Sequence, residues 1–148
     1  MRPMGDRDEI TALVMRYGEL LDAGDIDGVV AMFSRATWRS AANGTVLNTP
    51  AEIRAVYEGI VMHEGSPRTR HLFTNLVIEM DDGADDATGR LTYTVMQSVQ
   101  PGDPVQVLMV GRYEDRYHRG EDGWHLTDRL FLIDLMGDAS QHFPRASS

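Results

Sequence analysis

Four long segments of β-forming residues fill the second half of the chain, and this pattern constrains the fold more than any other feature of the sequence. The segments are 68–80, 87–100, 105–118 and 124–136. Each is separated from the next by a short stretch rich in glycine, proline or aspartate, which is typical of turns. Connections this short join antiparallel neighbours. The sequence therefore predicts an antiparallel sheet of long strands.

The first half of the chain predicts three helices and a small hairpin. Apolar residues recur at steps of three and four over 8–22, behind an acidic first turn that suits a helix N-terminus. Asp25 fits the N-cap of a short second helix. Thr49 and Glu52 have the spacing of a capping box that starts a third helix. Between the second and third helices, residues 37–47 predict two short strands joined by an Asn-Gly turn.

The chain has the length of one domain. Its 148 residues contain no repeat, low-complexity tract or linker. Three helices before a strongly curved antiparallel sheet predict an α+β domain with the helices packed on one face of the sheet. The core is expected to span about 8–136. The tail, 137–148, either closes a pocket or frays.

Composition excludes several classes of function. The chain has no cysteine and no lysine, which removes thiolate nucleophiles, disulfides and enzyme-bound Schiff bases. Its 14 basic residues stand against 23 acidic ones, and the net charge of −9 disfavours a nucleic-acid partner. Glycine-rich phosphate loops, closely spaced histidine metal ligands and a serine-hydrolase elbow are all missing. We therefore expect neither a cofactor nor a metal.

The sequence also lacks the apolar segments that direct a chain to or through a membrane. No apolar run approaches the roughly 18 residues that a membrane-spanning helix needs. The first ten residues carry no apolar signal core. We therefore expect a cytoplasmic protein with no membrane partner.

Two residues stand out as candidates for acid–base chemistry. Asp22 lies in the last turn of the first helix, where the helix dipole disfavours a negative charge, so it is either a solvated helix-end residue or a functional one. His71 lies near the start of the first long strand. Period-two alternation puts it on one face with Phe73, Asn75 and Val77. It is either a hydrogen-bonded core residue or a proton carrier.

An arginine and three aromatic residues complete the candidate set. Arg129 shares one face of the last strand with Phe131, and a guanidinium among apolar neighbours needs an anion. That anion is either half of a structural ion pair or negative charge developing on a ligand. Tyr17, Trp38 and Tyr57 supply aromatic surface for a core or for a pocket wall. Residue types alone indicate only a small acid–base site.

Three stretches of the sequence carry a resemblance to a known family. They are ITALVMRYGELLDAGD at 10–25 with its continuation to Trp38, TRHLFTNLVI at 69–78, and Gly123-Trp124 through Arg129 to Asp134. They resemble the nuclear-transport-factor-2-like superfamily, in its SnoaL-like branch. The resemblance is strongest to the group of scytalone dehydratase, hexachlorocyclohexane dehydrochlorinase and bile-acid 7α-dehydratase. It covers about 8–136 and implies a cone-shaped α+β barrel.

The resemblance implies roles for individual residues. In that group an aspartate at the end of the first helix hydrogen-bonds a histidine on the first long strand, and the pair removes a proton from carbon as a leaving group departs. These positions correspond to Asp22 and His71. Tyr17 and Trp38 fall on pocket residues of the group, and Arg129 is placed like an arginine that lines several of these pockets.

The leading hypothesis from the sequence is a cofactor-independent lyase or isomerase, of dehydratase type. Its substrate is expected to be small and hydrophobic: alicyclic, steroid-like or polyketide. His71 is the expected base, Asp22 orients it, and Arg129 stabilises negative charge. The expected pocket walls are Tyr17, Trp38, Tyr57, Phe73 and Asn75. The alternative is a noncatalytic module of the same fold that binds a small ligand or dimerises. Under either hypothesis the resemblance implies a homodimer or a higher homo-oligomer.

Overall fold

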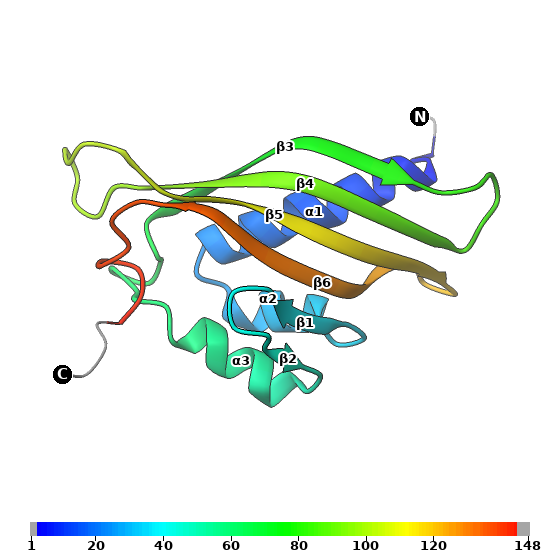
Figure 1. Ribbon diagram of the computed structural model, residues 1–148, viewed down its shortest axis with the longest axis horizontal. Helices are drawn as coiled ribbons and strands as arrows, with labels where there is room; N and C mark the ends of the chain where they lie inside the picture. Colours follow the sequence, from blue (N-terminus) through cyan, green and yellow to red (C-terminus); the bar gives the residue numbers. More distant parts are fainter. Residues whose placement is uncertain (1–2, 145–148) are drawn as a thin grey trace.

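Three helices and six strands follow one another in the computed structural model, which describes residues 3–144 (Figure 1). The helices are α1 (Asp6–Asp22), α2 (Ile26–Met32) and α3 (Pro50–Glu58). The strands are β1 (Thr37–Ser40), β2 (Val46–Leu47), β3 (Thr69–Glu79), β4 (Asp86–Gln97), β5 (Gln106–Gly120) and β6 (Gly123–Met136). This order confirms the predicted α+β class. No helix within the described residues is long and apolar enough to cross a bilayer.

The helices begin and end where local hydrogen bonding requires. The Asp25 carboxylate accepts from the backbone N–H of Gly28 (2.9 Å) and caps α2. Thr49 and Glu52 form the predicted capping box at the start of α3. Between α1 and α2 the chain turns at Gly24, whose φ is +75°. A Cβ there would lie 2.2 Å from a backbone carbonyl oxygen, so only glycine fits this turn.

The long strands form the predicted antiparallel succession within one curved, unclosed sheet. The strand order is β2-β1-β6-β5-β4-β3, and β3 to β6 pair with their sequence neighbours. In Figure 1 α1 lies against the long strands, and α2 and α3 lie near β1 and β2. The helices therefore share one face of the sheet.

The sheet is mixed, whereas the sequence predicted an antiparallel one. β1 and β2 form the expected hairpin, but β1 then pairs with β6 in parallel, in register from Thr37↔Asp128 to Ser40↔Phe131. Arg39 of β1 donates to Asp128 of β6 (2.7 Å) and ties the two strands together. The parallel pairing joins segments far apart in sequence, and local alternation carries no information about such partners.

The prediction that Asn75 and Val77 share a face of β3 with His71 is wrong, because β3 contains a bulge. The register with β4 shifts between Thr74 and Val77, and Asn75 has a positive φ of 55°. As a result Leu76 and Ile78 pack against the core, while Asn75 and Val77 are exposed. His71 and Phe73 precede the bulge and keep the predicted alternation.

The core lies between the helices and the inner face of the sheet. From α1 it receives Ile10, Val14, Tyr17 and Leu21. β4 and β5 contribute alternate residues, among them Leu91, Tyr93, Tyr113 and Tyr117. After β6, residues 137–144 pack back onto the domain, with the Val61 N–H bonded to the carbonyl of His142 (2.8 Å). The last part of the predicted tail, 145–148, lies outside the described residues.

Candidate active site

The structure brings Asp22 and His71 into direct contact. The Asp22 Oδ1 lies 2.6 Å from the His71 Nδ1, and its Oδ2 accepts from the His71 backbone N–H at 2.8 Å. The Thr69 hydroxyl donates to Oδ1 at 2.8 Å. The two side chains are only 7% and 5% exposed. The carboxylate is thus held at three points, and we call this arrangement the Asp22–His71 pair.

The hydrogen bonds fix the charge and the tautomer of the pair. Burial alone would raise the pKa of Asp22, but hydrogen bonds and charge from His71, helped by Thr69, hold that pKa below its ordinary value. The carboxylate accepts, so the His71 Nδ1 carries a hydrogen, and in this tautomer of imidazole the lone pair lies on Nε2. Nε2 has no hydrogen bond to any described residue. It is therefore free to act as a base.

A glycine in α1 allows the helix to approach His71 closely. A Cβ on Gly18 would lie 2.7 Å from the Phe73 ring and 3.1 Å from the Cβ of His71. Glycine inside a helix costs about 1 kcal/mol relative to alanine. That cost is offset by the close packing of α1 on β3, which brings Asp22 within hydrogen-bond distance of the imidazole.

A cleft of about 940 Å³ opens beside the Asp22–His71 pair. Both residues line it, together with Phe73 and Gln97. Its walls also include Met15, Met96 and Val105, and its rim carries Arg68 and Arg70. Of the predicted wall residues, Phe73 lines this cleft and the exposed Asn75 does not.

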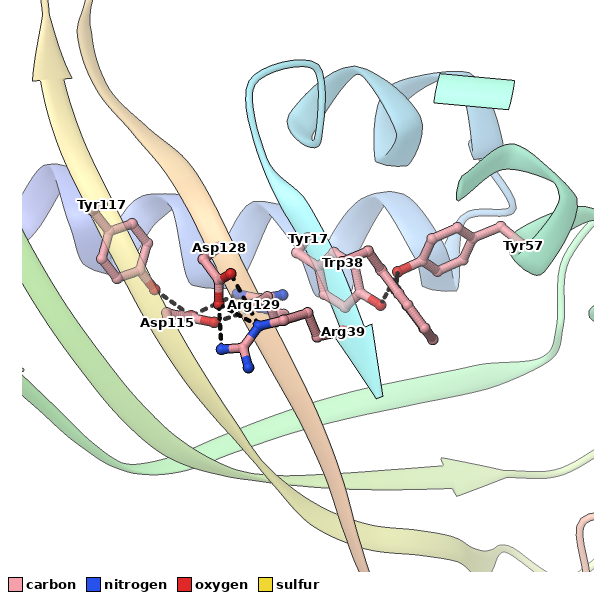
Figure 2. A network of polar contacts seen from close by, with 8 residues as sticks. All are labelled: Tyr17, Trp38, Arg39, Tyr57, Asp115, Tyr117, Asp128 and Arg129. Atoms are coloured by element: carbon pink, nitrogen blue, oxygen red, sulfur yellow. Dashed lines mark hydrogen bonds and ion pairs between the residues drawn. The ribbon is translucent and has the colours of Figure 1, made fainter. Parts of the chain in front are cut away.

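Tyr17, Trp38 and Tyr57, also predicted as walls, do not line this cleft: Tyr17 and Tyr57 are buried in the core and Trp38 is half-buried against it. The Tyr17 and Tyr57 hydroxyls are 2.9 Å apart, and the Trp38 indole N–H donates to the Tyr57 oxygen at 3.1 Å (Figure 2). The Tyr17 ring meets the His71 ring edge-on, with centroids 6.2 Å apart. Burial raises the pKa of Tyr57 to about 12, so its hydroxyl stays protonated. Tyr17 thus connects this hydrogen-bonded group to the pair.

Arg129 forms a buried ion pair with Asp115. Its Nε and Nη2 donate to the two carboxylate oxygens at 2.8 and 2.9 Å, and the residue is 1% exposed (Figure 2). The guanidinium lies over the rings of Tyr17 and Tyr113, 4.7 and 4.2 Å from their centroids. The Tyr117 hydroxyl also donates to Asp115. Of the two predicted possibilities for its anion, the structure therefore shows the ion pair.

The sequence interpretation missed several residues near the site. Thr69 could have been found, because alternation places it two residues before His71 on the same face of β3. Asp115 lies between Tyr113 and Tyr117 on the inner face of β5, so the same rule would have predicted a buried carboxylate opposite Arg129. No local pattern indicated Gln97 or His142. Among residues 3–144, no group of three potential ligand side chains is arranged to hold a metal ion.

The fold is the one seen in solved structures of NTF2-like proteins. Residues 2–129 match the model of the SnoaL-like domain family. The chain belongs to the SnoaL-like domain family. No curated protein matches it.

Three solved structures illustrate the likeness. An NTF2-like protein with a cystatin-like fold from Novosphingobium aromaticivorans shares 22% identity over 92% of this chain and 86% of its own, with a TM-score of 0.73. A scytalone dehydratase candidate from the same organism has 17% identity, coverage of 94% and 92%, and a TM-score of 0.69. ActVI-ORFA from Streptomyces coelicolor has 23% identity, coverage of 88% and 98%, and a TM-score of 0.73. At these identities the likeness shows the shared fold.

Proposed function

We propose that this protein is a cofactor-independent lyase or isomerase of dehydratase type. The observation that carries the proposal is the buried Asp22–His71 pair, with its 2.6 Å contact beside an open cleft. In the proposal Nε2 of His71 removes a proton from a carbon of the substrate, and Asp22 orients the ring and stabilises the imidazolium that forms.

In a dehydration by this pair, a single imidazole can serve as both the base and the acid. The C–H electron pair becomes a C=C bond as the C–O bond of the neighbouring carbon breaks. The proton taken up by Nε2 passes to the departing hydroxyl, which leaves as water and restores the neutral ring. An isomerisation uses the same first step and returns the proton to another carbon. Both reactions need a side chain that takes up a proton in one step and returns it in the next, and imidazole is the common choice for that exchange.

The surroundings of the pair support a small, largely hydrophobic substrate, whether alicyclic, steroid-like or polyketide. The volume of about 940 Å³ lies at the upper end of what small-ligand pockets occupy. Phe73 and the methionines supply apolar contact, and the arginines of the rim suit an oxygen-bearing substituent. We assign Arg129, Tyr57 and Trp38 a positioning role, since they contact or support Tyr17, which in turn contacts His71.

The noncatalytic alternative rests on a different observation. The interior between α1 and the sheet is filled by aromatic rings, with Tyr17 and Tyr113 centroids 5.8 Å apart and Tyr113 and Phe131 centroids 5.1 Å apart. A filled interior favours a module that binds a ligand at its surface cleft or associates with a second copy of the chain.

One variant separates the two functions. Wild type and Asp22→Asn are screened by thermal shift and native mass spectrometry against hydroxylated steroids, terpenoids and aromatic polyketides, and each binder is assayed for loss of water or isomerisation. We expect Asp22→Asn to bind the same compounds and to lose turnover by about 10²- to 10⁴-fold.

Asp25→Asn is the matched control. It removes the same charge three residues further along, and asparagine is as good an N-cap as aspartate. This variant should turn over like wild type. A compound that all three proteins bind equally and leave unchanged would contradict the lyase proposal and support the binding module.

A further inference from the structure

Two arginines line the cleft that holds the Asp22–His71 pair. Arg68 lies just before β3 and Arg70 within it, and β3 is the edge strand of the sheet. Both arginines are exposed, and neither forms an ion pair with a described carboxylate. The cleft that contains the proposed base therefore carries two positive charges that no direct contact neutralises.

Arg68 is held in place by backbone groups instead of a counter-ion. Its Nε donates to the carbonyl of Ser98 at 3.0 Å, and the Ser98 N–H donates to the carbonyl of Arg68 at 3.3 Å. The backbone of Arg68 has a positive φ of 57°, which residues with a side chain rarely adopt outside turns and functional sites. The two terminal nitrogens donate to no described residue. A guanidinium fixed at Nε presents them as a fork that matches the two oxygens of a carboxylate.

Arg70 adds a second positive charge to the same wall. Its Nη1 donates to the carbonyl of Thr69 at 3.3 Å, and its other nitrogens have no acceptor within residues 3–144. Arg70 is the partner of Met96 in the ladder between β3 and β4, and Met96 also lines the cleft. A ligand on this wall therefore contacts apolar surface and positive charge side by side.

The acidic residues of the cleft decide which kind of anion it suits. Among the lining residues, Asp22 and Glu19 carry carboxylates. The Asp22 carboxylate is already bonded to His71 and Thr69. Glu19 is exposed on α1 and forms no ion pair with a described residue. Both carboxylates repel an anion, as does the net charge of −9, and they repel a doubly charged phosphate more than a singly charged carboxylate.

We propose that Arg68, helped by Arg70, binds a carboxylate of the substrate, so that the substrate is a hydrophobic carboxylic acid. Phe73 and Met15 line the same cleft and supply contacts for its apolar body. The inference rests on the proposed function in placing the substrate in this cleft beside His71. It adds a selection for acids over neutral compounds of the same shape.

A matched pair of probes tests this selection without any turnover. Equilibrium dialysis of the full chain at neutral pH measures the dissociation constants of 2-naphthoate and 2-naphthamide, which are similar in shape and differ in charge. A charge-assisted contact at an exposed rim corresponds to about a three- to tenfold preference for the acid. We expect wild type to show this preference and Arg68→Gln to lose most of it. Arg68→Lys should keep part of the preference, because the charge remains.

The control variant is Arg90→Gln, which removes the same charge elsewhere. Arg90 is exposed on β4, forms no ion pair with a described residue and does not line the cleft, so its replacement should leave the preference intact. Equal affinities of wild type for both probes, an unchanged preference in Arg68→Gln, or equal losses in Arg68→Gln and Arg90→Gln would each overturn the inference. No binding of either probe up to its solubility limit would overturn it as well.

Two measurements on wild type alone do not depend on the folding of a variant. The preference for 2-naphthoate should weaken as sodium chloride is added, because exposed charges are screened, and a preference that salt leaves unchanged would contradict the role of the arginines. A third probe, 2-naphthyl phosphate, carries more negative charge on the same ring system. We expect it to bind less tightly than 2-naphthoate, and tighter binding would overturn the assignment of a carboxylate.

Asp22→Asn separates this inference from the lyase proposal. If wild type and Asp22→Asn both prefer 2-naphthoate and no screened compound is turned over, the carboxylate subsite stands and the lyase does not. Turnover of a screened compound by wild type without a preference for 2-naphthoate means the reverse.

Discussion

Asp115→Asn is expected to destabilise the protein severely, because it removes the charge that compensates a buried guanidinium. Arg129 and Asp115 are 1% and 3% exposed. Their two hydrogen bonds are 2.8 and 2.9 Å long, and Nη1 of Arg129 already has no partner within the described residues. Burial would lower the pKa of Arg129, but Asp115 more than offsets this, so the arginine stays charged. The variant therefore leaves a charge in the core.

The size of the effect follows from that burial. Removing one member of a buried pair costs about 3–5 kcal/mol of unfolding free energy. Domains of this size have only about 5–15 kcal/mol in total. At about 2–4 °C per kcal/mol, the midpoint of thermal unfolding should fall by roughly 6–20 °C. Urea unfolding followed by circular dichroism gives the free energy directly.

The chain contains a matched control on its surface. Arg112 and Asp134 make the same two-point contact, at 2.9 and 3.0 Å, but both side chains are more than 40% exposed. Exposed ion pairs contribute little to the free energy of unfolding. The Asp134→Asn variant should therefore unfold at the same urea concentration as wild type. If Asp115→Asn and Asp134→Asn lose similar free energy, burial is not what makes the Arg129 pair important. The double variant Asp115→Leu with Arg129→Met should recover most of the loss, since it removes both charges.

Two further predictions concern stability. Because the pKa of His142 falls from 6.5 to about 4 on folding, the unfolded chain binds more protons between these values, and the stabilisation present above pH 6.5 is lost as the pH falls to 4. Wild type should lose about 3 kcal/mol of unfolding free energy across that range, and His142→Phe should not. Urea titrations at several pH values measure this, and parallel pH profiles of the two proteins would contradict the reasoning. Gly24→Ala should cost at least about 2 kcal/mol, through its φ of +75° and the 2.2 Å approach of a carbonyl oxygen. Gly83→Ala shares the positive φ but meets nothing within 4 Å, so calorimetry should show a smaller drop in its melting temperature.

Much of the fold could be predicted because the decisive signals are local. The turns between the long strands, the capping box at Thr49 and the apolar spacing of α1 each involve residues close together in sequence. The parallel pairing of β1 with β6 involves residues about ninety positions apart, and nothing in Thr37–Ser40 specifies that partner. The bulge at Asn75 could not be predicted from the local sequence either, since it depends on how β3 aligns with β4.

The candidate site divides in the same way. Asp22 and His71 were singled out by unfavourable helix-end charge and by residue type, and a family resemblance suggested that they meet. Arg129 was correctly predicted to need an anion, but the sequence alone did not identify Asp115, which lies opposite Arg129 only through the pairing of β5 with β6. His142 follows no periodic pattern. Its burial results from the packing of an irregular segment, which only the three-dimensional structure shows.

The parallel pairing of β1 with β6 also determines when the protein can fold during synthesis. β1 leaves the ribosome early, but its neighbour in the sheet is the last strand to be made. Contacts between such distant segments slow folding, and an unpaired strand edge invites association with other chains. Until residues 128–131 emerge, both β1 and the open edge of β5 are available for wrong partners. Nascent chains stalled before this point are therefore the form of the protein most exposed to aggregation and most dependent on chaperones.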